Sequence, residues 1–107
     1  MANDIVLKFI KTNHFKQRQV ERQVSDTLLV RVLSCIKSEL QDAALCVVVS
    51  EKRLSEWRYC TTTDSHAKRA HNLVIAMANR VLITLYFCND LKRFMHKHSR
   101  KEKFVIV

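Results

Sequence analysis

The chain contains neither glycine nor proline, the two residues that most often build tight turns. Glycine reaches positive φ angles at no steric cost, and its missing side chain lets the backbone approach a phosphate group closely. The glycine-rich phosphate loops of the Walker and Rossmann nucleotide-binding folds are therefore excluded. We expect every turn to be made instead by asparagine, aspartate or serine.

The first forty residues predict one strand and two helices. Residues 4–12, "DIVLKFIKT", alternate between apolar and polar positions and predict a strand. Residues 13–23 are rich in good helix formers, and Asn13 can cap the helix that they predict. Ser25 can cap a second helix over residues 26–40. The apolar residues of this second helix recur at steps of three and four: Leu29, Val32, Ile36 and Leu40.

The second half of the chain predicts a meander of strands. Residues 43–50 are apolar on both faces and rich in β-branched side chains, which is typical of a central strand. Residues 71–78 and 81–88 predict two further strands that pair with each other. The Asn79-Arg80 link between them is short enough for a tight hairpin, in which asparagine tolerates positive φ.

The remaining segments complete the expected fold. Residues 51–70 are polar and weakly patterned, and either extend a hairpin or form a long loop. Residues 91–107 predict a basic, helical tail that closes with an edge strand over 104–107. Helices followed by a run of strands predict an α+β fold, with an antiparallel sheet and two helices between its first and second strands. We expect a single domain over residues 1–107 with its core in residues 4–90.

Charge and composition narrow the class of partner. Lysine and arginine total 19 against 10 acidic residues, which gives a net charge of +9, and 48% of the residues are apolar, enough for a hydrophobic core. A charge excess of this size favours a polyanionic partner, either nucleic acid or an acidic protein. The first residues do not resemble a signal peptide and no apolar run is long enough to span a bilayer, so we expect a cytoplasmic protein without membrane contact.

The four cysteines, Cys35, Cys46, Cys60 and Cys88, include no Cys-x-x-Cys pair. Zinc sites usually take two ligands from one such closely spaced pair. We therefore expect free thiols, and neither a metal nor another cofactor.

Three side chains, His14, Arg18 and Arg22, follow one another at four-residue steps. On a helix these positions share one face, because each step of four residues turns by only about 40°. Arginine holds two phosphate oxygens through its planar fork, and histidine is the residue type that most readily transfers a proton near neutral pH. The three residues therefore predict a phosphate-binding stripe with a proton-transfer group. A solvated helix face that is cationic by chance stays open as the alternative.

Tyr86 is a further candidate for the catalytic site. It shares a face of its strand with Thr84, while the opposite face carries Ile83, Leu85 and Phe87. If the apolar face packs on the helices, Tyr86 lies on the open face of the sheet; a core position is the alternative. Seven other residues are candidates for contacts to nucleic-acid phosphates. They are Lys11, Lys16, Lys68, Arg69, Arg80, Lys92 and Arg93.

The segment "TNHFKQRQVERQVSDTLLVRVL", residues 12–33, resembles a motif in an uncharacterised branch of the RelE/BrnT-like toxin superfamily of small ribonucleases. In that motif a strand ends in Thr-x-His, two arginines follow, and a short turn ending in serine leads into the second helix. The matching positions are Thr12, His14, Arg18, Arg22, Val24 and Ser25. The order of elements over residues 4–90 and the closing hairpin "LVIAMANRVLITLYFCNDL" are also similar. Gln23 stands where the branch usually has glycine, and residues 51–70 form an insertion.

The resemblance implies a RelE-like fold and a toxin-type endoribonuclease that needs no metal. In such an enzyme His14 transfers a proton, Arg18 and Arg22 stabilise the phosphorane, and Tyr86 belongs to the catalytic site. The implied partners are RNA, with or without the ribosome, and an acidic antitoxin protein. Two alternatives stay open: a non-catalytic nucleic-acid-binding module, and a protein-interaction module whose charge only aids solubility.

Overall fold

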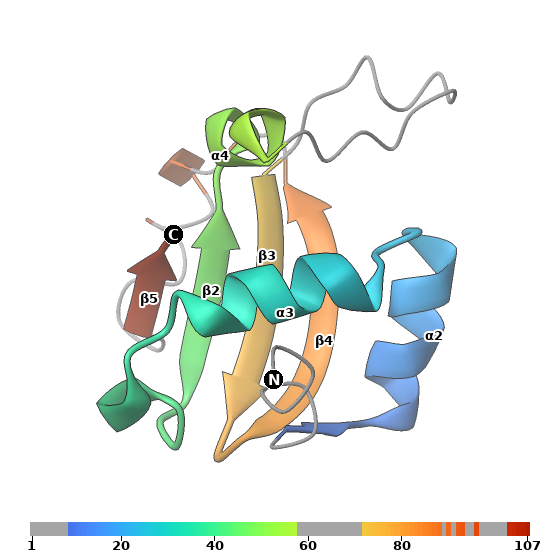
Figure 1. Ribbon diagram of the computed structural model, residues 1–107, viewed down its shortest axis with the longest axis vertical. Coiled ribbons are helices and arrows are strands. Elements are labelled where there is room, and N and C mark those ends of the chain that lie inside the picture. Colours follow the sequence, from blue (N-terminus) through green and yellow to red (C-terminus); the bar gives the residue numbers. More distant parts are fainter. Residues whose placement is uncertain (1–8, 58–71, 89, 91, 94–95, 97–102) are drawn as a thin grey trace.

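The described residues fold into a mixed five-stranded sheet with helices packed on one of its faces (Figure 1). The computed structural model describes residues 9–57, 72–88, 90, 92–93, 96 and 103–107. In chain order the elements are β1 (Ile10–Lys11), α2 (Asn13–Glu21), α3 (Asp26–Ser34), the 3-10 helix η1 (Ser38–Leu40), β2 (Leu45–Val49), α4 (Glu51–Glu56), β3 (Asn72–Ala78), β4 (Val81–Cys88) and β5 (Lys103–Ile106). The fold is α+β, as predicted.

The strands lie in the order β1-β4-β3-β2-β5. The central strands β2, β3 and β4 are antiparallel neighbours, and β5 lies at one edge, both as predicted. The edge strands pair in parallel, β1 with β4 and β5 with β2, so the prediction of a purely antiparallel sheet is wrong. Alternation along a strand sets the face that each side chain takes, but it does not set the direction of the neighbouring strand.

The helices α2 and α3 both lie between β1 and β2 along the chain, which confirms the predicted pair. α3 crosses the face formed by β2, β3 and β4 (Figure 1). It ends at Ser34 and not at residue 40, and the side chains of Ser34 and Cys35 donate to backbone carbonyls one turn earlier. Such side-chain bonds compete with a continued helix. The buried residues of α3 are Leu28, Leu29, Val32 and Leu33.

Apolar side chains fill both faces of the central sheet. Phe15 of α2 and Leu54 of α4 join α3 over one face of the sheet. β2 is buried along its whole length, which confirms it as a central strand. On the other face Cys46, Val48 and Val74 form a second, smaller cluster. Partly buried residues surround this cluster: Ala76, Tyr86, Cys88 and Phe104.

The N-terminal caps fix where the two long helices begin. Thr12, and not Asn13, caps α2, because its hydroxyl accepts the N–H of Phe15 at 3.0 Å. Ser25 caps α3 as predicted. The strand expected over residues 4–12 is present as the two residues of β1, and residues 4–8 lie outside the described residues.

Gln23 takes the left-handed conformation, with φ 56°, in the turn between α2 and α3. The N–H of Gln23 donates to the carbonyl of Val20 at 3.2 Å, and the N–H of Val24 donates to that of Gln19 at 3.0 Å. These two bonds form a Schellman motif, in which glycine usually takes the left-handed position. The expectation that only asparagine, aspartate and serine make the turns is therefore wrong here.

The link between β3 and β4 is the expected tight turn. Asn79 and Arg80 both have positive φ, 49° and 63°, which is typical of a type I′ hairpin. The predicted pairing of residues 71–78 with 81–88 is confirmed from residue 72 onward. Arg80 is thus, after Gln23, a second turn residue with positive φ that is not asparagine, aspartate or serine.

A β-bulge interrupts this hairpin. The partners of Ala76 and Met77 are Thr84 and Leu82, which leaves Ile83 without a residue opposite. Leu82 therefore takes the helix-facing position, while Ile83 is 42% exposed. Ile83 therefore does not pack on the helices with Leu85 and Phe87, because the bulge shifts the alternation by one residue.

The segment expected to be a hairpin extension or a loop begins with a helix. Residues 51–56 form α4, which Ser50 caps. The rest of this segment, residues 58–70, lies outside the described residues. Cys35, Cys46 and Cys88 are free thiols, and Cys60 lies in the same undescribed stretch. None of the described helices is long and apolar enough to cross a membrane.

Candidate nucleic-acid interface

The first turn of α2 is attached to β4 at the bulge. The N–H of Thr12 donates to the carbonyl of Leu82 at 3.1 Å, and its hydroxyl donates to the carbonyl of Ile83 at 2.9 Å. Phe15, fully buried beneath the same turn, anchors it to the core. Thr12 and Phe15 stand on either side of His14 along the chain. The two hydrogen bonds of Thr12 and the burial of Phe15 therefore fix the position of His14.

The side chain of His14 makes its own contact to β4. Its Nε2 lies 3.0 Å from Oγ1 of Thr84, the residue that follows the bulge. Thr84 belongs to the face of β4 that turns away from the buried Leu85. The exposed imidazole of His14 thus lies at the margin of the sheet face opposite α3.

Arg18 and Tyr86 are the next residues beyond this contact on their own elements, α2 and β4. α2 runs beside β4 in the same direction (Figure 1). Four residues of helix advance by about 6 Å, and two residues of strand by about 6.6 Å. Arg18 is therefore one helical turn beyond His14 on α2, and Tyr86 is two residues beyond Thr84 on β4. We call these four residues, with Arg22, the α2–β4 site.

Arg18 is held by an acidic neighbour on its own helix. Its guanidinium lies 3.3 Å from Oε2 of Glu21, and both side chains are well exposed, at 38% and 44%. Gln17 donates to the other oxygen of the same carboxylate at 3.0 Å. Exposed ion pairs of this kind are weak, so a phosphate group can replace Glu21 as the partner of Arg18.

Arg22 extends the line of His14 and Arg18 although α2 ends one residue before it. Its N–H still donates to the carbonyl of Arg18 at 2.8 Å, which continues the helical spacing. Its side chain is exposed and has no ion-pair partner among the residues that the structure describes. The predicted shared face of His14, Arg18 and Arg22 is therefore present.

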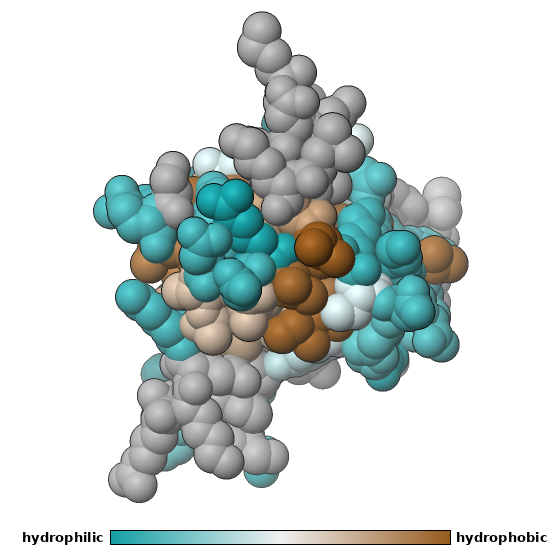
Figure 2. Space-filling model, turned by 90° about the horizontal axis from the view of Figure 1, so that it is seen from below, coloured by the Kyte–Doolittle hydropathy of each residue, from teal (hydrophilic) through white to brown (hydrophobic). Residues whose placement is uncertain are grey.

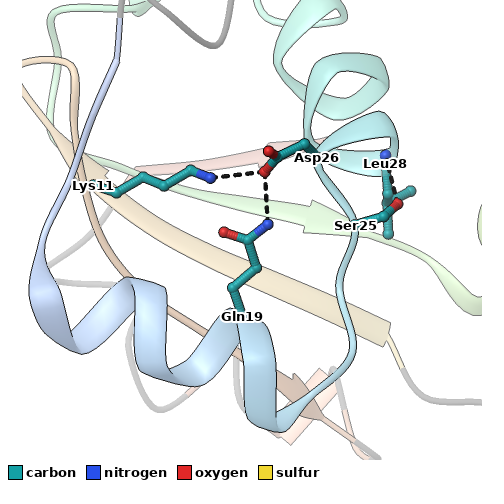
Figure 3. A network of polar contacts seen from close by, with 5 residues as sticks. All are labelled: Lys11, Gln19, Ser25, Asp26 and Leu28. Carbon is teal, nitrogen blue, oxygen red and sulfur yellow. Dashed lines mark hydrogen bonds and ion pairs between the residues drawn. The ribbon is translucent and has the colours of Figure 1, made fainter.

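Lys11 does not contribute a free charge to this surface. Its Nζ lies 2.7 Å from Oδ1 of Asp26, and Gln19 donates to the same oxygen at 2.8 Å. Figure 3 shows the two side chains converging on Asp26, next to the Ser25 cap. The hydrogen bonds from Lys11 and then Gln19 lower the pKa of the Asp26 carboxyl below its usual value of 3.8.

The other predicted phosphate contacts are scattered. Arg80 Nε lies 2.8 Å from Oδ1 of Asp42, an ion pair without the alignment of a hydrogen bond. Lys16 is exposed but leaves α2 about 200° around the helix from His14. Lys92 and Arg93 are exposed and have helical backbone, and the carboxylate of Asp90 accepts the N–H of Arg93 at 3.0 Å. Lys68 and Arg69 lie outside the described residues.

The surface near β1 is partly apolar. Ile10 at the start of β1 is exposed, as is Ile83 at the bulge. Figure 2 shows apolar surface in brown between hydrophilic areas in teal on the underside of the molecule. The cationic surface is therefore narrow and centres on the side of α2 that carries Arg18 and Arg22, which we call the cationic side of α2.

Sequence reasoning missed Thr84 as the partner of His14. The two residues are 70 positions apart, and only the parallel pairing of β1 with β4 and the bulge bring them together. A threonine on the outer face of a strand carries no local signal of such a contact. Comparison of the chain with protein-family models, with curated proteins and with solved structures finds no match. The geometry of the α2–β4 site is therefore the basis for a functional proposal.

Proposed function

We propose that the protein is a small RNA-binding endoribonuclease of the toxin type, with a RelE-like arrangement, that cleaves RNA without a metal ion. The observation that carries the proposal is the placement of His14. Its imidazole is fixed against Thr84 at one end of a line that continues with Arg18 and Arg22. A proton-transfer group beside two phosphate-binding side chains is the minimum that RNA cleavage through a 2′-hydroxyl requires.

In this mechanism His14 takes the proton of the substrate's 2′-hydroxyl. The 2′-oxygen then forms a bond to phosphorus, the bond from phosphorus to the 5′-oxygen breaks, and the leaving 5′-oxygen takes up a proton from water. Arg18 and Arg22 hold the phosphate oxygens and stabilise the charge of the phosphorane through their paired N–H donors. The N–H groups of Asn13 and His14 at the start of α2 have no partner among the described residues and add a favourable field for an anion beside His14. Tyr86, two residues beyond Thr84 on β4, contacts the nucleotide from the sheet.

The proposed partners follow from the charge of the chain. A net charge of +9 suits RNA in the cytoplasm, free or on the ribosome. The same charge suits an acidic antitoxin protein that covers the cationic side of α2 and so blocks the α2–β4 site.

The experiment is a cleavage assay on single-stranded RNA with the purified protein in the presence of EDTA. We expect products that end in a 2′,3′-cyclic phosphate, and a loss of rate of about 100-fold or more in His14→Ala, with RNA affinity nearly unchanged. Val20→Ala is the matched control, because Val20 lies on the same helix, is 79% exposed and points away from His14. Cleavage that EDTA abolishes, or His14→Ala protein that cleaves as fast as the parent, contradicts the proposal.

A non-catalytic nucleic-acid-binding module is the second candidate. The hydrogen bond of His14 to Thr84 favours it, because this bond gives the imidazole a structural partner without any chemistry. Binding of RNA that weakens steeply with salt, in the absence of strand cleavage, would select this function.

A further inference from the structure

The bulge in β4 brings the backbone carbonyl of Ile83 and the side chain of Thr84 to the start of α2. In a regular strand Ile83 and Thr84 would point to opposite faces of the sheet. With Ile83 left out of the pairing register, its carbonyl accepts the hydroxyl of Thr12, and the next residue presents its own hydroxyl to His14. Bulges commonly redirect side chains in this way. The contact between His14 and Thr84 therefore depends on a specific local distortion of β4.

Only one of the two ring nitrogens of His14 takes part in this contact. Thr84 Oγ1 lies 3.0 Å from Nε2. The other nitrogen, Nδ1, points to nearly the opposite side of the ring, and His14 is exposed. In a neutral imidazole the hydrogen bond made by one nitrogen decides which nitrogen carries the proton.

We propose that Thr84 is a positioning residue for His14: its hydroxyl accepts the Nε2–H and so holds the ring in the tautomer whose Nδ1 is a free proton acceptor facing the open surface. The role of Nδ1 in RNA cleavage rests on the proposed function, whereas the state of the ring does not. The other threonine hydroxyl of this region already donates to the carbonyl of Ile83, which leaves Thr84 as the hydroxyl that meets the ring. If Thr84 donated instead, Nδ1 would carry the proton and could not accept one from a substrate.

The decisive measurement is nuclear magnetic resonance of the ring nitrogens in ¹⁵N-histidine-labelled protein, with the imidazole neutral. We expect His14 to show a protonated Nε2 and an unprotonated Nδ1. Thr84→Val removes the hydroxyl at nearly constant shape and should shift His14 toward a mixture of both tautomers. Thr84→Ser keeps a hydroxyl and should restore the parent spectrum. Thr27→Val, an exposed threonine on α3, is the matched control and should leave His14 unchanged.

The same variants separate this inference from the proposed function. If the protein cleaves RNA, Thr84→Val should lower kcat by about tenfold or more with little change in KM, because a misplaced catalytic group loses rate and not substrate binding, and Thr84→Ser should largely rescue it. A labelled parent protein with the proton on Nδ1, or a Thr84→Val spectrum identical to the parent's, overturns the inference. The expected spectra without any RNA cleavage uphold the positioning by Thr84 and reject the catalytic function.

Discussion

The Nζ of Lys11 and Oδ1 of Asp26 lie 2.7 Å apart, so an ion pair joins the edge strand β1 to the first turn of α3. Gln19 of α2 donates to the same oxygen (Figure 3), and three elements therefore meet at one carboxylate. Asp26 also lies at the positive end of the α3 dipole, where a negative charge is stabilising. This cluster fixes the strand that leads directly into Thr12 and His14.

The contribution of Asp26 should depend on pH. Hydrogen bonds from Lys11, and then from Gln19, lower the pKa of its carboxyl in the folded protein below 3.8. The unfolded chain then binds the proton more tightly, so the stabilisation is complete above about pH 4 and is lost as the pH falls through the lower pKa of the folded state. Because Asp26 is 67% exposed, solvent screening keeps the effect small. We expect Asp26→Asn to lower the free energy of unfolding at neutral pH by about 0.5–1 kcal/mol.

Urea denaturation of the parent and of Asp26→Asn over a series of acidic pH values measures this effect. The two unfolding free energies should converge once Asp26 is protonated in both states of the parent. Glu39→Gln is the control, because Glu39 is exposed and has no ion-pair partner within the described part of the chain. A gap between parent and Asp26→Asn that persists into strong acid would show that the charge of Asp26 is not the cause.

The turn at Gln23 should gain stability from glycine. Gln23 has φ 56°, a conformation that costs a residue with a side chain about 1–2 kcal/mol. Glycine removes most of this cost but makes the unfolded chain more flexible, so we expect Gln23→Gly to raise the free energy of unfolding by about 0.5–1 kcal/mol. Gln17→Gly is the matched control: Gln17 lies inside α2, where glycine should lower stability by about 1 kcal/mol. Loss of stability in both variants would argue against the left-handed turn.

The elements that the sequence predicts correctly rest on local patterns. Ser25 precedes an apolar period of three and four residues, and two apolar runs flank Asn79-Arg80, so α3 and the β3–β4 hairpin follow directly. The bulge carries no such signal, because Ile83 is a good strand former in an unbroken apolar run. Thr84 could not be predicted as the partner of His14 for the same reason, because the bulge determines which residue of β4 contacts the imidazole.

The arginines and lysines show a second limit of sequence reasoning. A sequence gives the number of charges but not which of them are neutralised in the fold. The sequence predicted Lys11 and Arg80 as phosphate contacts, yet the fold pairs them with Asp26 and Asp42 from distant parts of the chain. The helical spacing of His14, Arg18 and Arg22 could be predicted because it depends only on α2.

Removing Glu21 should strengthen RNA binding. Its carboxylate is paired with Arg18 and would repel a phosphate group that approaches the same guanidinium. We expect Glu21→Gln to raise RNA affinity by about two- to fivefold, equivalent to a surface ion pair of roughly 0.5–1 kcal/mol. Glu56→Gln is a closely matched control, because Glu56 pairs with Arg53 at the same i,i+3 spacing on α4. Fluorescence anisotropy with a labelled single-stranded RNA measures both, and an equal gain from Glu56→Gln would mean that only net charge matters.

Arg18 and Arg22 should each account for one phosphate contact. If they do, these two contacts alone should lower the RNA affinity of the parent by about sevenfold between ~50 and ~200 mM salt, since each contact releases counterions from the single-stranded RNA, and further phosphate contacts should raise the fall to an order of magnitude or more. Arg18→Ala and Arg22→Ala should each weaken binding and reduce the slope of log affinity against log salt by about one. Lysine should restore the slope but only part of the affinity, because it keeps the charge and loses the bidentate fork.

Arg53→Ala on α4 is the control. It removes an arginine that is similarly exposed and similarly paired but lies away from the α2–β4 site, and it should leave the slope unchanged. A slope that Arg53→Ala reduces as much as Arg18→Ala does would place the phosphate contacts across the whole surface and not at α2.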